Sequence, residues 1–197
     1  MLVDSEPLAE EAWAHVLARC GGEVTADDIS AVAGTSNVDT YKYFARGHDL
    51  PSFGETTAAV DEYLLSALAD RLEPFADAVD TVRALAAEGV PLAVASSSNR
   101  AELDLKLAKF DLARYFGFVI AGDEVADAKP APDIYLAAAE GLGVEPRSCV
   151  AVEDSVNGAI AAQAAGMRVV LVDRVGIIPA SWSTVTSVDA ALITMWL

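Results

Sequence analysis

Residues 150–158 read Val-Ala-Val-Glu-Asp-Ser-Val-Asn-Gly. A short apolar run leads into two adjacent carboxylates, after which Ala-rich helical spacing continues to Gly166. This change of period predicts a strand, an acidic turn and a helix. In an open α/β sheet, ligands bind where strands end and helices begin. The stretch therefore places Glu153 and Asp154 at an edge that is suited to chemistry.

The two carboxylates have two possible interpretations. Adjacent carboxylates repel each other unless a cation lies between them, and an all-oxygen site of this kind suits Mg²⁺. Alternatively, Glu153 and Asp154 belong to a solvated helix start, in which Asp and Ser side chains cap free amides. The stretch by itself favours the helix start, so the rest of the chain has to decide between the two.

Strand and helix patterns alternate on both sides of this stretch. Apolar runs predict strands at residues 91–95, 116–121, 149–152 and 168–172. Because these runs are continuously apolar, they indicate a parallel sheet that is covered on both faces. Residues 6–72 show helical patterns and no strand signal. We therefore expect an all-helical domain followed by an α/β core.

Length, charge and cysteine usage exclude several classes. A chain of 197 residues suits one domain, or a core with a smaller inserted domain. The net charge of −17 argues against a nucleic-acid surface. No apolar run approaches the ~18 residues of a membrane span. Cys20 and Cys149 have no metal-type spacing and suggest reduced thiols of a cytoplasmic protein, which we expect to be a monomer.

Two further strand ends carry polar groups. Ser96-Ser97-Ser98-Asn99 leaves one predicted strand and enters a helix, where hydroxyls and free amides favour phosphate. A Ser-rich helix cap is the alternative. Lys129 lies in a Pro-braced loop after the next strand. It is either a solvated side chain or an ammonium that the stiff loop aims at a fixed point.

In a parallel sheet these segments emerge at the same edge. Hydroxyl and amide donors, a fixed cation and two carboxylates for magnesium would then surround one pocket. Such a set suits phosphoryl transfer, because positioning and charge stabilisation supply most of its rate. The combination is far more specific than any of its parts.

The three strand ends resemble motifs of one family. Ser96, Lys129-Pro130-x-Pro132-Asp133 and Glu153-Asp154-Ser155-x-x-Gly158 resemble motifs two, three and four of the haloacid-dehalogenase-like hydrolase superfamily. Gly122-Asp123-Glu124-Val125 is similar to its β-phosphoglucomutase-like branch, and Asp4-Ser5-Glu6 resembles the end of that branch's first motif.

The resemblance covers essentially the whole chain. It implies an α/β fold, in which a Rossmann-like parallel core at residues 1–4 and 76–197 carries an all-helical cap at residues 5–75. It also implies Mg²⁺ and an aspartyl-phosphate intermediate.

Family roles fall on particular residues of this chain. By resemblance, Ser96 binds a phosphate oxygen, and Lys129 balances the charge of the phosphate and the nucleophile. Glu153 and Asp154 would bind the metal. Three further residues would line the pocket: Ser97, Ser98 and Asn99.

The family's nucleophile and acid/base are two Asp residues separated by one residue on the first strand. No two aspartates of this chain have that spacing, and Asp4 matches a later Asp at the cap hinge. The first central strand is therefore expected to be missing. Losing about five buried apolar residues, at ~1.5–3 kcal/mol each, would remove most of a domain's stability margin of about 5–15 kcal/mol. We therefore expect the natural start to lie upstream, with a truncated, inactive protein as the alternative.

We expect a magnesium-dependent phosphatase of small phosphorylated metabolites such as sugar phosphates, and an inactive chain for residues 1–197 alone. Gly34-Thr35-Ser36-Asn37 resembles the cap's substrate loop, which makes Ser36 and Asn37 candidate substrate-binding residues. Asn37 stands where the phosphoglucomutases place a basic residue, so a mutase is the runner-up. A dehalogenase is disfavoured, because dehalogenation needs no magnesium and would leave Glu153 and Asp154 without a role. A non-catalytic remnant that binds phosphate or a partner protein is the alternative from another class.

Overall fold

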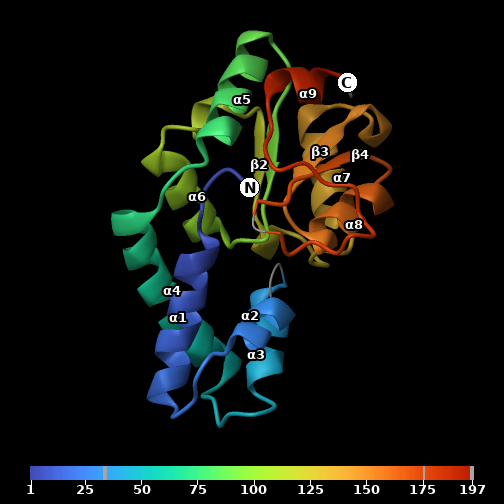
Figure 1. The fold of residues 1–197 in the computed structure, drawn as a ribbon. Coiled ribbons are helices and arrows are strands. Elements are labelled where there is room, and N and C mark those ends of the chain that lie inside the picture. Colours follow the sequence, from blue (N-terminus) through green and yellow to red (C-terminus); the bar gives the residue numbers. More distant parts are fainter. Residues whose placement is uncertain (33–34, 175, 196–197) are drawn as a thin grey trace. The chain divides into compact units, whose positions relative to one another are not determined.

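The computed structural model describes residues 1–32, 35–174 and 176–195. The chain divides into two compact units, and Figure 1 labels most of their elements. Residues 3–73 form what we call the helical unit. Residues 1–2 and 74–197 belong to what we call the α/β unit.

Every regular element described in the helical unit is a helix: α1 (Glu6–Arg19), α2 (Ala26–Val32), α3 (Asn37–Phe44) and α4 (Phe53–Arg71). Helix α1 packs against α4, with Leu17 and Leu68 fully buried on their apolar faces. Glu11 of α1 and Arg71 of α4 form an ion pair at 2.6 Å. Ser52 and Glu55 form a reciprocal capping box at the start of α4, which satisfies amides that the first turn leaves free.

Helices and strands alternate in the α/β unit, as the apolar runs predict. The helices are α5 (Ala76–Ala87), α6 (Arg100–Lys109), α7 (Asp133–Leu142), α8 (Val156–Ala164) and α9 (Ala190–Thr194). The strands are β1 (Ala93–Ala95), β2 (Phe118–Ile120), β3 (Val150–Glu153) and β4 (Arg168–Leu171). Short 3₁₀ turns at 113–115, 122–124 and 146–148 complete the connections.

The strands form two parallel pairs. Strand β1 pairs with β2, with Ala93 opposite Phe118. Strand β3 pairs with β4, with Val150 opposite Arg168. Among the described residues no strand is hydrogen-bonded between β1 and β3, so the two pairs are separate sheets.

Helices cover both faces of these strands, which confirms the predicted α/β class. Ala93 and Ala95 contribute to a core with α7 and α8, whereas Val94, between them, packs with residues of α5 and α6. The pair β3–β4 shares the first of these cores through Ala151 and Val169. Both strand pairs therefore lie in one layer, with their carboxyl ends at a common edge.

None of the described helices is both long enough and apolar enough to span a membrane.

Candidate functional site

The buried centre of the carboxyl edge is an ion pair between Lys129 and Glu153. Lys129 Nζ lies 2.5 Å from Glu153 Oε1, and both side chains are only 8% exposed. The same ammonium donates to the carbonyl oxygen of Ala95 at 3.0 Å. Lys129 therefore connects the last residue of β1 with the last residue of β3. A solvated Lys129, one of the two interpretations of the sequence, is wrong.

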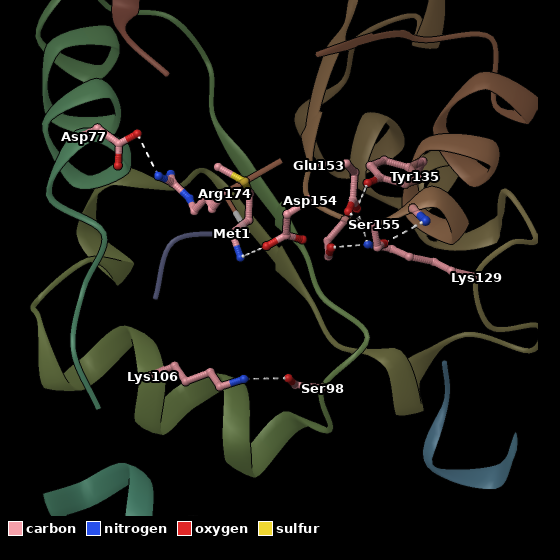
Figure 2. Close-up of polar contacts among 12 residues, drawn as sticks. Met1, Asp77, Ser98, Lys106, Lys129, Tyr135, Glu153, Asp154, Ser155 and Arg174 are labelled. Carbon is pink, nitrogen blue, oxygen red and sulfur yellow. Dashed lines mark hydrogen bonds and ion pairs between the residues drawn. The ribbon is translucent and has the colours of Figure 1, made fainter. Parts of the chain in front are cut away.

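Tyr135 of α7 completes this cluster (Figure 2). Its hydroxyl donates to Glu153 Oε1, and Lys129 Nζ lies 4.9 Å from the centre of its ring. Burial, followed by the nearby charge of Glu153, raises the pKa of Tyr135 far above its ordinary value. The phenol consequently remains a proton donor to the carboxylate.

Gly158 allows Glu153 to lie against the first turn of α8. A Cβ at residue 158 would lie 2.2 Å from the carboxyl carbon of Glu153. Ser155 caps the same helix by accepting the Gly158 amide at 3.0 Å. The helix-start interpretation is therefore right for Ser155, whereas Glu153 is buried and is not part of a solvated face.

Asp154 is the first residue after β3, and its partners differ from those of Glu153. Its Oδ2 atom is 2.6 Å from the terminal ammonium of Met1, and its side chain is 36% exposed. Burial alone would raise the pKa of Asp154, but the charge and hydrogen bond of that ammonium outweigh burial and lower it. Asp154 is therefore an ionised carboxylate that already faces a cation.

The two carboxylates fit a magnesium ion unequally. Asp154 supplies a hard oxygen of the kind that Mg²⁺ prefers, on a side chain that is 36% exposed. Glu153 Oε1 is occupied by Lys129 and Tyr135. No group of three or more acidic, His or Cys side chains that could hold a metal occurs within the described ranges. Of the two carboxylates, Asp154 is therefore the one whose oxygens are not taken up by Lys129 and Tyr135.

The loop from Ser96 to Asn99 is held by its own backbone and by Gly122. The Ser98 amide donates to Ser96 Oγ at 3.2 Å, and the Gly122 amide donates to the Ser98 carbonyl at 2.8 Å. A Cβ at residue 122 would lie 2.5 Å from the Ser97 carbonyl oxygen. Glycine is therefore required where the loop after β2 meets the loop after β1.

The remaining candidates have different surroundings. Ser97 is exposed, and Asn99 caps α6 by accepting the Glu102 amide at 2.9 Å. Ser36 caps α3 and Asn37 is the first residue of that helix, so both belong to the helical unit. Gly34 of the same sequence pattern is outside the described residues.

Two residues near the site were missed by sequence reasoning. Tyr135 has the spacing of an ordinary core residue on α7, and its contact with Glu153 joins positions that are 18 residues apart. Lys106 lies one turn after Glu102 on α6, which is the usual spacing of a surface ion pair. The pair is nevertheless buried, and Lys106 reaches Ser98. The spacing was readable from the sequence, but the burial was not.

Comparisons with known proteins identify the family of the chain. The family model of haloacid dehalogenase-like hydrolases matches residues 2–166. The fructose-1-phosphate phosphatase YqaB of Escherichia coli is 34% identical over 86% of this chain and 89% of its own length. The bifunctional riboflavin kinase/FMN phosphatase of Arabidopsis thaliana is 29% identical over 97% of this chain.

Some of the similar proteins are much longer. The match spans 50% of the riboflavin kinase/FMN phosphatase and 48% and 17% of two other relatives. Among solved structures, CbbY from Rhodobacter sphaeroides in complex with phosphate superimposes with a TM-score of 0.86 at 25% identity. That superposition covers 98% of this chain and 92% of CbbY. The chain belongs to the haloacid dehalogenase-like hydrolase family.

Proposed function

We propose that the protein hydrolyses phosphate monoesters of small metabolites, with sugar phosphates as the first substrates to test. The observation that carries this proposal is the meeting of the Ser96–Asn99 loop, Lys129 and Asp154 at one sheet edge. The loop offers hydroxyl donors, Lys129 a buried positive charge, and Asp154 an ionised oxygen ligand. These groups match the charges of a phosphoryl group in transfer.

The residues have complementary roles in the proposed reaction. Ser96 binds a phosphate oxygen, and Lys129 stabilises the negative charge that phosphate brings beside Glu153. Glu153 and Tyr135 hold Lys129 in place. Asp154, with Glu153 next to it, would hold Mg²⁺, which on binding supplies Lewis-acid stabilisation of the phosphate oxygens.

We further propose a covalent route. The carboxylate oxygen of the nucleophilic Asp bonds to phosphorus as the bond from phosphorus to the ester oxygen breaks, and the leaving alcohol takes a proton from the acid/base Asp. Water then gives a proton back to that Asp and attacks phosphorus, the bond to the carboxylate breaks, and inorganic phosphate is released. Because no two aspartates of residues 1–197 have the Asp-x-Asp spacing, we propose that this stretch alone does not turn over. The nucleophile would come from a preceding strand.

Phosphate release tests the function. Fructose 1-phosphate, hexitol phosphates, glucose 1-phosphate and FMN would be incubated with residues 1–197, and with the product of the open reading frame including any in-frame upstream codons. We expect magnesium-dependent release by the longer protein and none by residues 1–197. Ordinary turnover by residues 1–197 would refute the inactivity. An in-frame stop codon before Met1 would favour the non-catalytic phosphate-binding alternative.

A mutase is the second candidate. A mutase must bind a second phosphate group, and Asn37 stands where the phosphoglucomutases have a basic residue for it. We therefore expect hydrolysis of glucose 1-phosphate to exceed its isomerisation. Glucose 6-phosphate as the main product would reverse this order.

Calorimetry tests the metal ligand. Asp154→Asn removes one carboxylate charge, and we expect magnesium affinity to fall about tenfold or more, because each full ionic ligand contributes more than the ~1.4 kcal/mol of a tenfold change. Asp80→Asn, which removes the same charge from an exposed position on α5, is the matched control. Equal magnesium affinity in the two variants would exclude Asp154 as a ligand.

A further inference from the structure

Helix α6 carries a second buried ion pair, which has no part in the Lys129 cluster. Glu102 and Lys106 lie one helical turn apart, and each side chain is only 11% exposed. Removing two charges from water is costly, so such a pair is a poor source of stability by itself. Its position next to the loop after β1 suggests another purpose.

Lys106 has a partner beyond Glu102. Its Nζ atom lies 3.0 Å from Ser98 Oγ, and Figure 2 shows the side chain reaching from α6 to the loop. An ammonium group can only donate hydrogen bonds. Ser98 Oγ must therefore be the acceptor, and the hydrogen of its hydroxyl remains available for a different partner.

The hydroxyl of Ser96, like that of Ser98, accepts a hydrogen bond from a protein donor. Its Oγ atom accepts the Ser98 amide at 3.2 Å, so its hydroxyl hydrogen is also directed elsewhere. A hydroxyl has one hydrogen to donate and lone pairs to accept with. In both serines a protein donor occupies a lone pair, which favours the donor role of the hydroxyl. Two hydroxyl donors two residues apart suit a ligand that presents only acceptors, such as a phosphate dianion.

We propose that Lys106 is a positioning residue of the phosphate-binding loop. Glu102 fixes the ammonium, the ammonium fixes Ser98 Oγ, and the Ser98 hydroxyl is thereby committed to donate to a phosphate oxygen. This inference rests on the proposed function, because it takes the loop at residues 96–99 as the phosphate site. It adds a positive charge that acts through Ser98.

Inorganic phosphate, titrated by calorimetry into residues 1–197, tests this role. We expect Lys106→Met to weaken phosphate binding about tenfold, the scale of one hydrogen bond that involves a charged group. Lys106→Arg keeps a donor and should retain most of the affinity. Lys109→Met removes the same charge from an exposed position on α6 and should leave phosphate affinity unchanged.

A double-mutant cycle separates positioning from general electrostatics. Ser98→Ala should weaken phosphate binding, and Lys106→Met should then have no further effect in the Ser98→Ala background. Because Lys106→Met leaves Glu102 buried without its cation, the matched variant is Glu102→Met/Lys106→Met, which removes both charges and is expected to retain stability. We expect it to show the same loss of phosphate affinity.

The outcomes distinguish this inference from the proposed function. If the unmodified protein and Lys106→Met bind phosphate equally well, Lys106 does not position Ser98. The assignment of residues 96–99 as the phosphate-binding loop is then retained. If Lys106→Met lowers phosphate affinity by the same factor in the unmodified protein and in the Ser98→Ala variant, Lys106 does not act through Ser98. If the unmodified protein does not bind phosphate, residues 96–99 are not a phosphate-binding loop. The proposed role of Lys106 is then refuted as well.

Discussion

The loops after β1 and after β3 end at the same edge of the α/β unit, but their polar groups are bonded differently. At the β3 end, Lys129, Tyr135 and Glu153 form a closed, buried cluster that also reaches Ala95 of β1. At the β1 end, the hydroxyls of Ser96 and Ser98 accept from protein donors and keep their own hydrogens available.

This difference predicts that the β3 end contributes mainly to stability and the β1 end mainly to phosphate binding. Changes at the β3 end should mainly reduce stability, because each removes one member of a buried charged network. Changes at the β1 end should mainly reduce phosphate binding, because the Ser96 and Ser98 hydroxyls already accept from protein donors and are left to donate to the proposed phosphate. Four substitutions test this contrast, from the largest expected effect on stability to the smallest.

Lys129→Met should have the largest effect. It leaves the Glu153 carboxylate buried without its cation, which costs about 3–5 kcal/mol of unfolding free energy. Urea denaturation of residues 1–197 measures this loss. Lys42→Met, at a position that is 64% exposed, is the matched control. If the double variant Lys129→Met/Glu153→Gln regains stability, the loss is due to the unpaired charge of Glu153. If Lys129→Met does not change the free energy of unfolding, the β3 end is not the stabilising one.

Tyr135→Phe should be next. It keeps the ring beside Lys129 but removes the hydroxyl that donates to Glu153, at a cost of about 1.5–3 kcal/mol. The same denaturation experiment applies, with Tyr63→Phe as a control, since the Tyr63 hydroxyl makes only a 3.5 Å contact on an exposed surface. A loss no greater than that of Tyr63→Phe would mean that the phenol does not support Glu153.

Gly122→Ala tests the β1 end. The new Cβ would meet the Ser97 carbonyl at 2.5 Å, and moving that backbone should cost about 1–3 kcal/mol. We also expect weaker phosphate binding, because the loop at residues 96–99 must move. Gly47→Ala, whose Cβ would meet no atom within 4 Å, controls for the glycine itself. Loss of stability with unchanged phosphate affinity would show that the loop conformation does not matter for the ligand.

Glu124→Gln should have the smallest effect. Glu124 accepts from the Arg100 guanidinium and from the Ala121 amide at 2.8 Å, and the hydrogen bond from Arg100 is the main reason that its pKa is lowered. A lowered pKa stabilises the fold above the unfolded-state value, and the contribution is lost as pH falls through the folded-state pKa. The difference in Tm between the two proteins should therefore be present at about pH 7 and shrink as the pH falls below about 4.3, the ordinary pKa of Glu. A difference that persists in acid would assign it to packing.

Much of the fold could be predicted from local patterns. The strands at Ala93–Ala95 and Val150–Glu153 are short apolar runs followed by polar residues, and a parallel sheet brings such ends to one edge. Lys129 and Glu153 could be assigned to that edge for the same reason. The apolar runs did not predict that, within the described part of the chain, β1–β2 and β3–β4 form two separate two-stranded sheets.

The inner arrangement of the site was not predictable in the same way. The sequence shows two adjacent carboxylates, but only the packing of α7 decides that Glu153 is the buried one. The Tyr135 hydroxyl meets Glu153 because α7 lies against both strand pairs, a contact that no local pattern encodes. Burial of Lys106 likewise depends on how α6 meets the loop after β1.

The alternation of side chains in β3 also restricts how this gene can change in length. Ala151 and Glu153 are buried on one side of the strand, while Val150 and Val152 pack on the other. Insertion or deletion of a single codon between 150 and 152 would move Glu153 from the buried side of the strand to the other side, even with every other residue unchanged. Purifying selection should therefore act on the number of residues in this strand as strongly as on their identity.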